Sequence, residues 1–296
     1  MTGFSMVAAM RISIVLAQCL ASSAFVFQHA PPQQTTLYSA IAPGDRVLVV
    51  GGTGGVGQLV TKKLQANGGC KVSVTSRSRE RGEEAIDDET VEVVEIDLIE
   101  ESQSKIEAML DGVSGMVVSV GTTAFPTAKW KGGNTPENVD KIAVTKLANA
   151  AAKCPTMKKV VLVTSVGVDR TDQMPFLFLN LFGVLDFKRS GEEAIKAAAA
   201  SSDFDYVIVR PGRLVGGPFT NLDVARLLQI EGGAENGVEC APGDDLLGDC
   251  KRDACAEAIV QALQVEEAKD IDFSIISTDS AALKPEGWKA EFIDLA

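Results

Sequence analysis

The stretch Val49-Val50-Gly51-Gly52-Thr53-Gly54-Gly55-Val56-Gly57 decides the fold of this chain. Its glycines Gly51, Gly54 and Gly57 stand at GxxGxxG spacing, after an apolar run that predicts a buried strand and before a pattern that predicts a helix. A turn of this kind brings backbone amides and the positive end of a helix dipole against a phosphate group. Because the glycines join a strand to a helix, the sequence predicts a dinucleotide-binding turn and not a glycine-rich turn without a ligand.

Apolar runs alternate with helical patterns along the rest of the chain. The alternation predicts an α/β fold, namely a single doubly wound Rossmann domain over residues 45–296, with a mostly parallel sheet and helices on both faces. A loop is predicted for the glycine-rich, acidic stretch 232–248. The predicted strands are 46–50, 70–76, 91–96, 115–120, 159–164, 206–209 and 273–276, and the predicted helices are 55–66, 134–152, 186–200, 253–263 and 285–295.

The composition excludes several classes of protein. The chain of 296 residues is 46% hydrophobic and 23% charged, as in ordinary globular proteins, and its net charge of −12 argues against nucleic acid as a partner. Its single histidine, His29, lies in a segment that we expect to be removed. A mature chain without histidine has no Ser-His-Asp triad and no histidine metal site, so no metal is predicted.

The N-terminal segment has the features of a targeting sequence. It contains no Asp or Glu before Asp45, and Arg11 precedes a short apolar run that ends in small residues suited to signal-peptidase cleavage. We predict a signal peptide over residues 1–24 and a plastid transit peptide over residues 25–44, because the second part is acid-free and rich in Ser, Thr, Gln and Pro. The alternative is an ordinary secreted protein.

The end of the second predicted strand indicates which nucleotide is bound. An acid at this position binds the ribose hydroxyls of NAD, but no acid occurs before Glu80. Arg77 lies 20 residues past Gly57, where a cation can pair with the 2′-phosphate of NADP(H). The alternative is a solvated basic loop. Asp97, after the third strand, can accept from the adenine amino group or stabilise a turn, and Gly121 lets the backbone approach the adenosine half.

These features together resemble the atypical short-chain dehydrogenase/reductases. The resemblance covers about residues 46–263 and includes Thr164-Ser165, Lys188 and Arg210-Pro211-Gly212 after the sixth strand. It implies that NADP(H) is lined by Thr53, Gly54, Gly55, Val56, Arg77, Asp97, Leu98, Gly121, Ser165, Lys188, Pro211 and Gly212.

Within that family, the chain is similar to a plastid branch. This branch includes the pyridine-nucleotide-sensing subunit of the inner-envelope protein translocon and its stromal relatives, and the similarity lies in residues 176–185 and in Arg252-Asp253. The join Ala21-Ser22-Ser23-Ala24-Phe25 also resembles the bipartite plastid presequence of diatoms, where an aromatic residue follows the signal cleavage site. The two resemblances imply location in the plastid stroma.

The catalytic set of the family is incomplete in this chain. Ser165 and Lys188 stand at the expected places, but Val184 occupies the position of the proton-donating tyrosine. The only tyrosine after the presequence region, Tyr206, falls inside a predicted strand. Two functions stay open: an NADPH-dependent oxidoreductase that uses Ser165 and Lys188 on an unidentified small-molecule acceptor, and a non-catalytic NADPH-sensing, assembly or scaffold protein of the plastid.

An unusual apolar segment, Pro175–Leu185, precedes Lys188. It is apolar except for Asn180 and Gly183, and with 11 residues it is too short to span a bilayer. We expect a buried helix beneath the substrate side of the cavity. The alternative is an exposed patch that docks a thylakoid or envelope protein partner.

Overall fold

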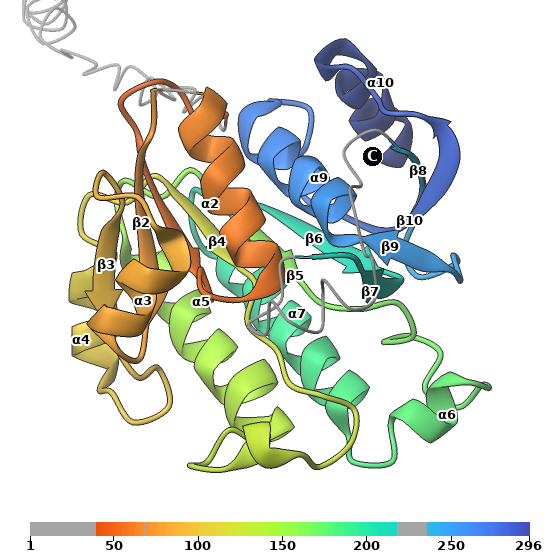
Figure 1. Ribbon diagram of the computed structural model, residues 1–296, viewed down its shortest axis with the longest axis horizontal. Helices are drawn as coiled ribbons and strands as arrows, with labels where there is room; N and C mark the ends of the chain where they lie inside the picture. The colour runs from red at the N-terminus through yellow and green to blue at the C-terminus, as the bar shows by residue number, and fades with distance from the viewer. Residues whose placement is uncertain (1–39, 68, 218–235) are drawn as a thin grey trace, which may run out of the picture. The chain divides into compact units, whose positions relative to one another are not determined.

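The fold is an eight-stranded sheet between two layers of helices (Figure 1). The structure is a computed structural model that describes residues 40–67, 69–217 and 236–296. The strands follow the order β3-β2-β1-β4-β5-β6-β10-β8, and all neighbours are parallel except β8, which pairs antiparallel with β10. Their bounds are β1 Arg46–Val50, β2 Lys71–Ser76, β3 Glu92–Glu95, β4 Gly115–Val118, β5 Lys159–Val163, β6 Asp205–Pro211, β8 Asn236–Pro242 and β10 Ile271–Ala281.

Alternate side chains of the strands pack in two separate hydrophobic cores, one on each face of the sheet. Val47 and Val49 of β1 pack in the core that also holds α2, α9 and α10, whereas Leu48 and Val50 pack with α4, α5 and α7. Because helices cover both faces of the sheet, both sets of side chains are buried. The central strands are therefore apolar runs without polar breaks. The helices are α2 Gly55–Asn67, α3 Arg79–Ile86, α4 Gln103–Met109, α5 Val144–Lys153, α6 Phe176–Leu179, α7 Val184–Ala200, α9 Arg252–Gln264 and α10 Pro285–Leu295.

The sheet order reverses beside β1. The chain runs from β1 outward through β2 to β3, and then returns to place β4 on the other side of β1. In open α/β sheets, the connections at the carboxyl ends of the strands diverge at such a point and leave a crevice. The fold therefore places the glycine turn after β1 at the edge of that crevice.

Most predicted elements are confirmed, and one prediction is wrong. All seven predicted strands and all five predicted helices are present, with shifted ends. The loop predicted for residues 232–248 instead contains β8, while residues 232–235 lie outside the described part of the chain. Gly237 and Glu239 interrupt the residue pattern that is typical of a strand. The β8 strand forms nevertheless, because it pairs with the free edge of β10. The structure adds α3, α4 and a two-stranded parallel sheet of β7 Arg213–Val215 and β9 Asp249–Lys251.

The folded unit begins before Asp45. Ile41 is buried in the core with α2 and α9, and its backbone N–H donates to the Leu263 carbonyl at 2.9 Å. The predicted end of the transit peptide at residue 44 stays a prediction, and cleavage there would remove this core side chain. The predicted signal peptide and most of the predicted transit peptide lie outside the described residues. Among those described, no helix is long and apolar enough to cross a membrane.

Lys159 makes stability depend on pH. Its side chain is fully buried, and its Nζ donates to the carbonyls of Ala262 and Val265 at 3.0 and 2.8 Å, at the end of α9. Burial lowers the pKa of Lys159 from 10.5 to about 8, despite nearby acids. The unfolded chain therefore holds this proton more tightly, so stability rises with pH between the two pKa values.

We predict that the variant Lys159→Met removes this dependence. The stability of the native protein relative to the variant should rise by roughly 2–3 kcal/mol from pH 7 to pH 10.5. Urea unfolding of both proteins across this range measures the difference. A difference that stays constant with pH would contradict the prediction.

Candidate functional site

Two adjoining cavities open at the carboxyl ends of the central strands. Their volumes are about 690 and 400 Å³, and they share Gly54, Gly121 and the backbone between Ser119 and Thr122. Thirteen of the fourteen residues predicted from the sequence line one or both of them. The larger cavity takes Gly54, Gly55, Val56, Gly121, Ser165, Lys188, Pro211 and Gly212, and the smaller takes Gly51, Thr53, Gly54, Arg77, Asp97, Leu98 and Gly121.

The glycine turn is packed too closely to admit side chains. Gly51 has a φ of +82°, and its N–H donates to the Thr75 hydroxyl at 3.2 Å. A Cβ on Gly57 would lie 2.3 Å from the Gly51 carbonyl oxygen, and one on Gly52 would lie 2.5 Å from the Val74 Cβ. Gly57 lines neither cavity, so its role is to let α2 approach the turn. Gly51, Gly54 and Gly55 of the turn therefore present backbone without side chains to the cavities, as the approach of a pyrophosphate requires.

Arg77 stands at the outer end of the smaller cavity. One of its guanidinium nitrogens donates to the Asn134 Oδ1 at 2.6 Å, and Asn134 also lines this cavity. The Asn134 side chain is itself held, since its Nδ2 donates to the Lys131 carbonyl at 2.6 Å. Arg77 is solvent-exposed, so its remaining N–H groups are accessible to a phosphate. Asn134 was expected only as part of a helix start, and its contact with Arg77 was not predicted.

The other polar groups of the smaller cavity have structural partners. One oxygen of Asp97 accepts from the Ile99 N–H at 3.0 Å, which is the turn role, while the residue also lines the cavity. Ser76 donates its hydroxyl proton to the Ser78 carbonyl at 2.7 Å, and the Ser78 hydroxyl caps α3. Among the described residues that line this cavity, Arg77 is the one basic side chain.

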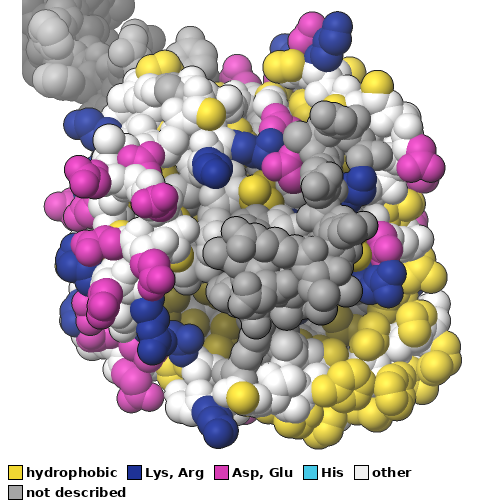
Figure 2. All heavy atoms as spheres, in the orientation of Figure 1, with side chains coloured by type: hydrophobic (Ala, Val, Ile, Leu, Met, Phe, Trp, Pro, Cys, Tyr) yellow, Lys and Arg dark blue, Asp and Glu magenta, His cyan; other side chains and the backbone are white. Residues whose placement is uncertain are grey.

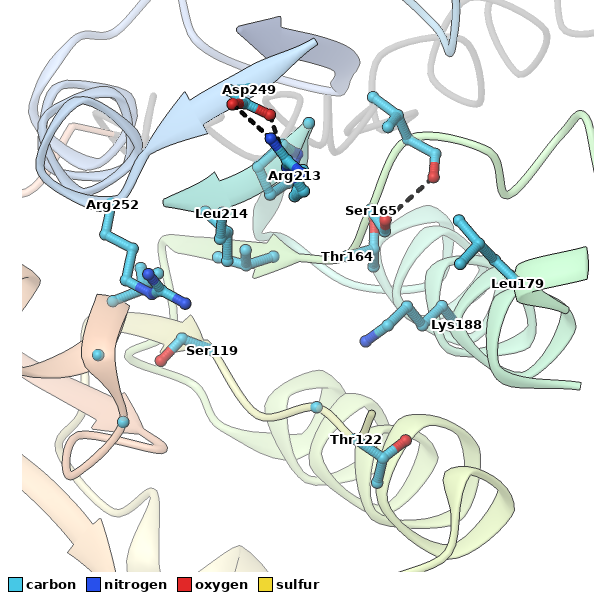
Figure 3. A pocket seen from close by; sticks show the side chains of 18 of the residues that line it. Ser119, Thr122, Thr164, Ser165, Leu179, Lys188, Arg213, Leu214, Asp249 and Arg252 are labelled. Atoms are coloured by element: carbon cyan, nitrogen blue, oxygen red, sulfur yellow. Dashed lines mark hydrogen bonds and ion pairs between the residues drawn. The ribbon is translucent and has the colours of Figure 1, made fainter. Parts of the chain in front are cut away.

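Lys188 projects from α7 into the larger cavity (Figure 3). A buried acid holds its ammonium group. Its Nζ lies 2.6 Å from the Asp140 Oδ1, and the two side chains are only 11% and 2% exposed. The other Asp140 oxygen accepts from the Thr122 hydroxyl at 2.5 Å. A Cβ on Gly121 would lie 2.9 Å from the Lys188 Nζ, so this glycine leaves room for the ammonium group. Asp140 was not predicted from the sequence.

A local widening of the helix before α5 positions Asp140. Residues Glu137–Ala143 form a π-helical segment, η2, and Asp140 lies in its middle. Such widened turns are frequent at functional sites. Gly191 of α7 packs against it, since a Cβ there would lie 2.5 Å from the Asp140 carbonyl oxygen. The close approach of α7 brings Lys188, three residues earlier on the same helix, within reach of the Asp140 carboxylate.

A buried charge cluster supports the strands behind Ser165. Arg210, at 2% exposed, donates to both oxygens of Glu192, with distances of 3.1 and 2.7 Å. Glu192 also accepts from the Thr164 hydroxyl at 2.5 Å. Burial opposes the charge on Arg210, yet the hydrogen bonds and charge of Glu192 raise its pKa. The cluster ties α7 to the ends of β5 and β6, where Ser165 and Pro211 line the cavity.

Among the described residues that line the two cavities, none is a tyrosine. Val184 is buried at the start of α7, one turn before Lys188. Tyr206 lies near the beginning of β6, whereas the cavities open at the carboxyl ends of the strands, and it lines neither cavity. Among the described residues, no group of histidine, cysteine or acidic side chains is arranged to hold a metal ion. Tyr206 therefore falls inside a strand, as predicted, and away from the site.

The outer wall of the larger cavity combines an ion pair with apolar side chains. Arg213 of β7 makes two contacts with Asp249 of β9, at 2.7 and 2.8 Å, and Arg252 enters from the start of α9 (Figure 3). On the other side, Phe176 and Leu179 of α6 line the cavity. The cavity therefore extends from the glycine turn to an apolar wall.

The strand order of the parallel sheet reverses beside β1, a glycine turn follows that strand, and two adjoining cavities open there. These features define a Rossmann-type dinucleotide-binding protein. The chain belongs to the NAD(P)H-binding family, whose profile matches residues 51–266. The predicted fold class and the predicted NAD(P)H-binding family are thereby confirmed.

Individual relatives agree with this assignment. The chain is 29% identical, over 255 residues, to Protein TIC 62, chloroplastic, of Oryza sativa subsp. japonica; the match covers 71% of this chain and 49% of that protein. The fold is shared with a putative NAD-dependent epimerase/dehydratase from Bacillus halodurans, with a TM-score of 0.63, 22% identity and coverage of 85% and 100%. It is also shared with a wide-type short-chain dehydrogenases/reductase from Veillonella parvula in complex with NADP, with a TM-score of 0.56, 15% identity and coverage of 78% and 94%.

Proposed function

We propose that the protein is an NADP(H)-dependent oxidoreductase of the plastid stroma. Its acceptor takes protons from water, so no tyrosine is needed. The observation that carries the proposal is the ammonium group of Lys188, which Asp140 holds inside the larger cavity that Ser165 also lines. A lysine on the surface needs no buried acid as its partner. The ion pair with Asp140 keeps the Lys188 ammonium group directed toward a ligand in the cavity.

The chain's own residues bind and orient. When bound, the nicotinamide nucleotide supplies the hydride, which the side chains of the protein cannot provide. Asp140 fixes the Lys188 ammonium group in place, and the remaining N–H groups of Lys188 would donate to ribose hydroxyls of the bound nucleotide. The hydroxyl of Ser165, which donates to the Val166 carbonyl at 3.0 Å, has lone pairs left to accept from a ligand. The apolar wall with Phe176 and Leu179 excludes water from the reacting face.

Arg77 supports a preference for NADP(H) over NAD(H). The smaller cavity carries this arginine at its end and has no acid at the end of β2 to accept from ribose hydroxyls. Asn134 holds one side of the guanidinium group and leaves its other N–H groups for a 2′-phosphate. The complex of the Veillonella parvula structure with NADP is consistent with this choice.

We predict that Arg77→Ala weakens NADPH binding about 10- to 100-fold and leaves NADH binding unchanged, because a charged hydrogen bond contributes roughly 1.5–3 kcal/mol. Calorimetric titration with both nucleotides measures the effect. Arg79→Ala is the matched control, because Arg79 lies two residues on, pairs with Glu83 and lines neither cavity. Equal losses for the two nucleotides would refute the role of Arg77.

The plastid location rests on the relatives and on the N-terminal segment. The relatives are chloroplastic proteins, and residues 1–24 and 25–44 have the order of a signal peptide followed by a transit peptide. This chain covers 49% of the rice protein's length, so the activity and partners of that whole protein are not transferred to it. Fusion of residues 1–44 to a fluorescent protein in a diatom tests the location: plastid fluorescence is expected, and secretion would contradict it.

Turnover tests the proposed reaction. The protein is mixed with NADPH and then with quinones, flavins and aldehydes, and oxidation is followed by absorbance. We expect oxidation with quinones or flavins, little with aldehydes, and at least a 100-fold loss in Lys188→Ala. Lys141→Ala is the control, since Lys141 is a half-exposed lysine paired with Glu137. Tight NADPH binding without oxidation by any acceptor would instead indicate an NADPH-sensing or assembly protein.

A further inference from the structure

A strip of exposed apolar side chains lies around α6. We call it the apolar strip, and it explains most of the hydrophobic surface at the lower right of Figure 2, where Figure 1 places α6. Its members are Phe125, Met174, Leu177, Phe178, Leu181 and Phe182, which are six of the nine large apolar side chains found exposed in the described part of the chain. The expectation of a buried helix for Pro175–Leu185 is therefore wrong for most of this segment, because α6 has only four residues and one turn cannot bury all of its side chains.

The apolar strip is continuous with the larger cavity. Within α6, Phe176 and Leu179 line the cavity, while Leu177 and Phe178 are 52% and 55% exposed. A single helical turn thus forms both the wall of the cavity and the surface outside it. A ligand that occupies the cavity beside Leu179 therefore lies within one helical turn of the apolar strip.

Ring contacts fix the strip in shape. The Phe125 ring lies 5.4 Å from the Phe178 ring and 6.2 Å from the Phe182 ring, and the Trp130 ring lies 5.9 Å from that of Phe182. These contacts join the loop after β4 to the segment around α6, which are distant in the sequence. The strip is therefore a prepared surface made of two segments, not a single exposed turn.

We propose that the acceptor is an amphiphilic quinone, whose ring enters the larger cavity and whose hydrocarbon tail lies on the apolar strip. The inference rests on the proposed oxidoreductase function and names its substrate class. The quinone takes up one hydride from NADPH and one proton from water to become the hydroquinone, and NADPH becomes NADP⁺. Water supplies that one proton, so the buried Val184 in place of a tyrosine is no obstacle. On this assignment, the exposed apolar side chains of the strip contact the hydrocarbon tail.

Binding to the NADP⁺-loaded protein tests the inference without turnover. Two probes share one head group: 2,3-dimethoxy-5-methyl-1,4-benzoquinone with no tail, and the same quinone with a decyl chain at position 6. Calorimetric titration should show at least tenfold tighter binding of the decyl quinone, because burial of methylene groups favours association. Equal affinities would overturn the inference, and this is the result expected if the strip docks a protein instead.

Variants place the tail on the strip. The double variant Phe178→Ser with Leu181→Ser should lose most of the preference for the decyl quinone while its NADPH affinity stays unchanged. Both side chains are more than half exposed, so the variant is expected to fold. Ile293→Ser is the matched control, because Ile293 is 53% exposed on α10 and lines neither cavity. A full tail preference in the double variant would overturn the inference.

The outcomes separate this inference from the proposed function. If the decyl quinone binds as expected but NADPH is not oxidised, the oxidoreductase function fails and the amphiphile site stands. If the tailless quinone is reduced as efficiently as the decyl quinone and binds equally well, the oxidoreductase function stands and the tail site fails.

Discussion

Replacing Gly57 with alanine is expected to abolish measurable nucleotide binding and to lower the free energy of unfolding by about 1–3 kcal/mol, the usual cost of overpacking. The new Cβ would lie 2.3 Å from the Gly51 carbonyl oxygen and 2.8 Å from the Gly52 Cα. Both atoms are backbone, so no flexible side chain can yield. Relief requires α2 to move away from the turn, and the amides at the helix start then no longer face the phosphates.

Urea unfolding and NADPH titration of the Gly57→Ala variant measure the two effects. Gly287→Ala is the control, because Gly287 lies in helix α10, away from the glycine turn. A Cβ at this position would make an ordinary contact with Leu283 at 3.4 Å. The control should bind normally and be as stable as the native protein or slightly more so. Native-like NADPH affinity in Gly57→Ala would show that the turn does not form the phosphate site.

Replacing Glu192 with alanine is expected to lower the free energy of unfolding by about 3–5 kcal/mol, the usual cost of removing one partner of a buried ion pair. Arg210 is 2% exposed and donates two hydrogen bonds to Glu192. Without Glu192, the guanidinium group keeps only Asp169 and Asp272, which both contact the same nitrogen, at 3.1 and 2.8 Å. The Thr164 hydroxyl loses its acceptor as well.

Chemical unfolding of the Glu192→Ala variant tests this expectation. The neighbouring Glu193→Ala is the control, because Glu193 is 67% exposed and pairs with Arg189 on the surface, where such pairs contribute little. We expect the control to stay within about 0.5 kcal/mol of the native protein. A loss below 1 kcal/mol in Glu192→Ala would mean that water or the two aspartates replace the missing carboxylate.

The sequence predicted the parts of the site that depend on local backbone geometry. Gly51, Gly54 and Gly57 are required by a strand, a turn and a helix that follow one another directly, so a short stretch specifies them. Arg77 was found because the end of the second strand always adjoins that turn in this fold. Ser165 and Lys188 came from resemblance to the family, and the structure places both in the larger cavity.

The parts that were missed depend on contacts between distant segments. Asp140 lies in an ordinary helical pattern, and only its contact with Lys188, 48 residues later, distinguishes it from a surface acid. The β8 strand needs β10 as a partner, and its own residues carry a weak signal. The exposure of Phe178 also could not be read from an apolar run, because apolarity alone does not say whether a short segment faces the core or the solvent.

The central claim is that this site binds NADP(H) through Arg77 at the end of the smaller cavity. The most direct test is calorimetric titration of the native protein with NADPH and with NADH in the same buffer, at one ionic strength, because a phosphate contact is sensitive to salt. The account predicts binding of NADPH at least tenfold tighter than that of NADH. Equal affinities for the two nucleotides would contradict it.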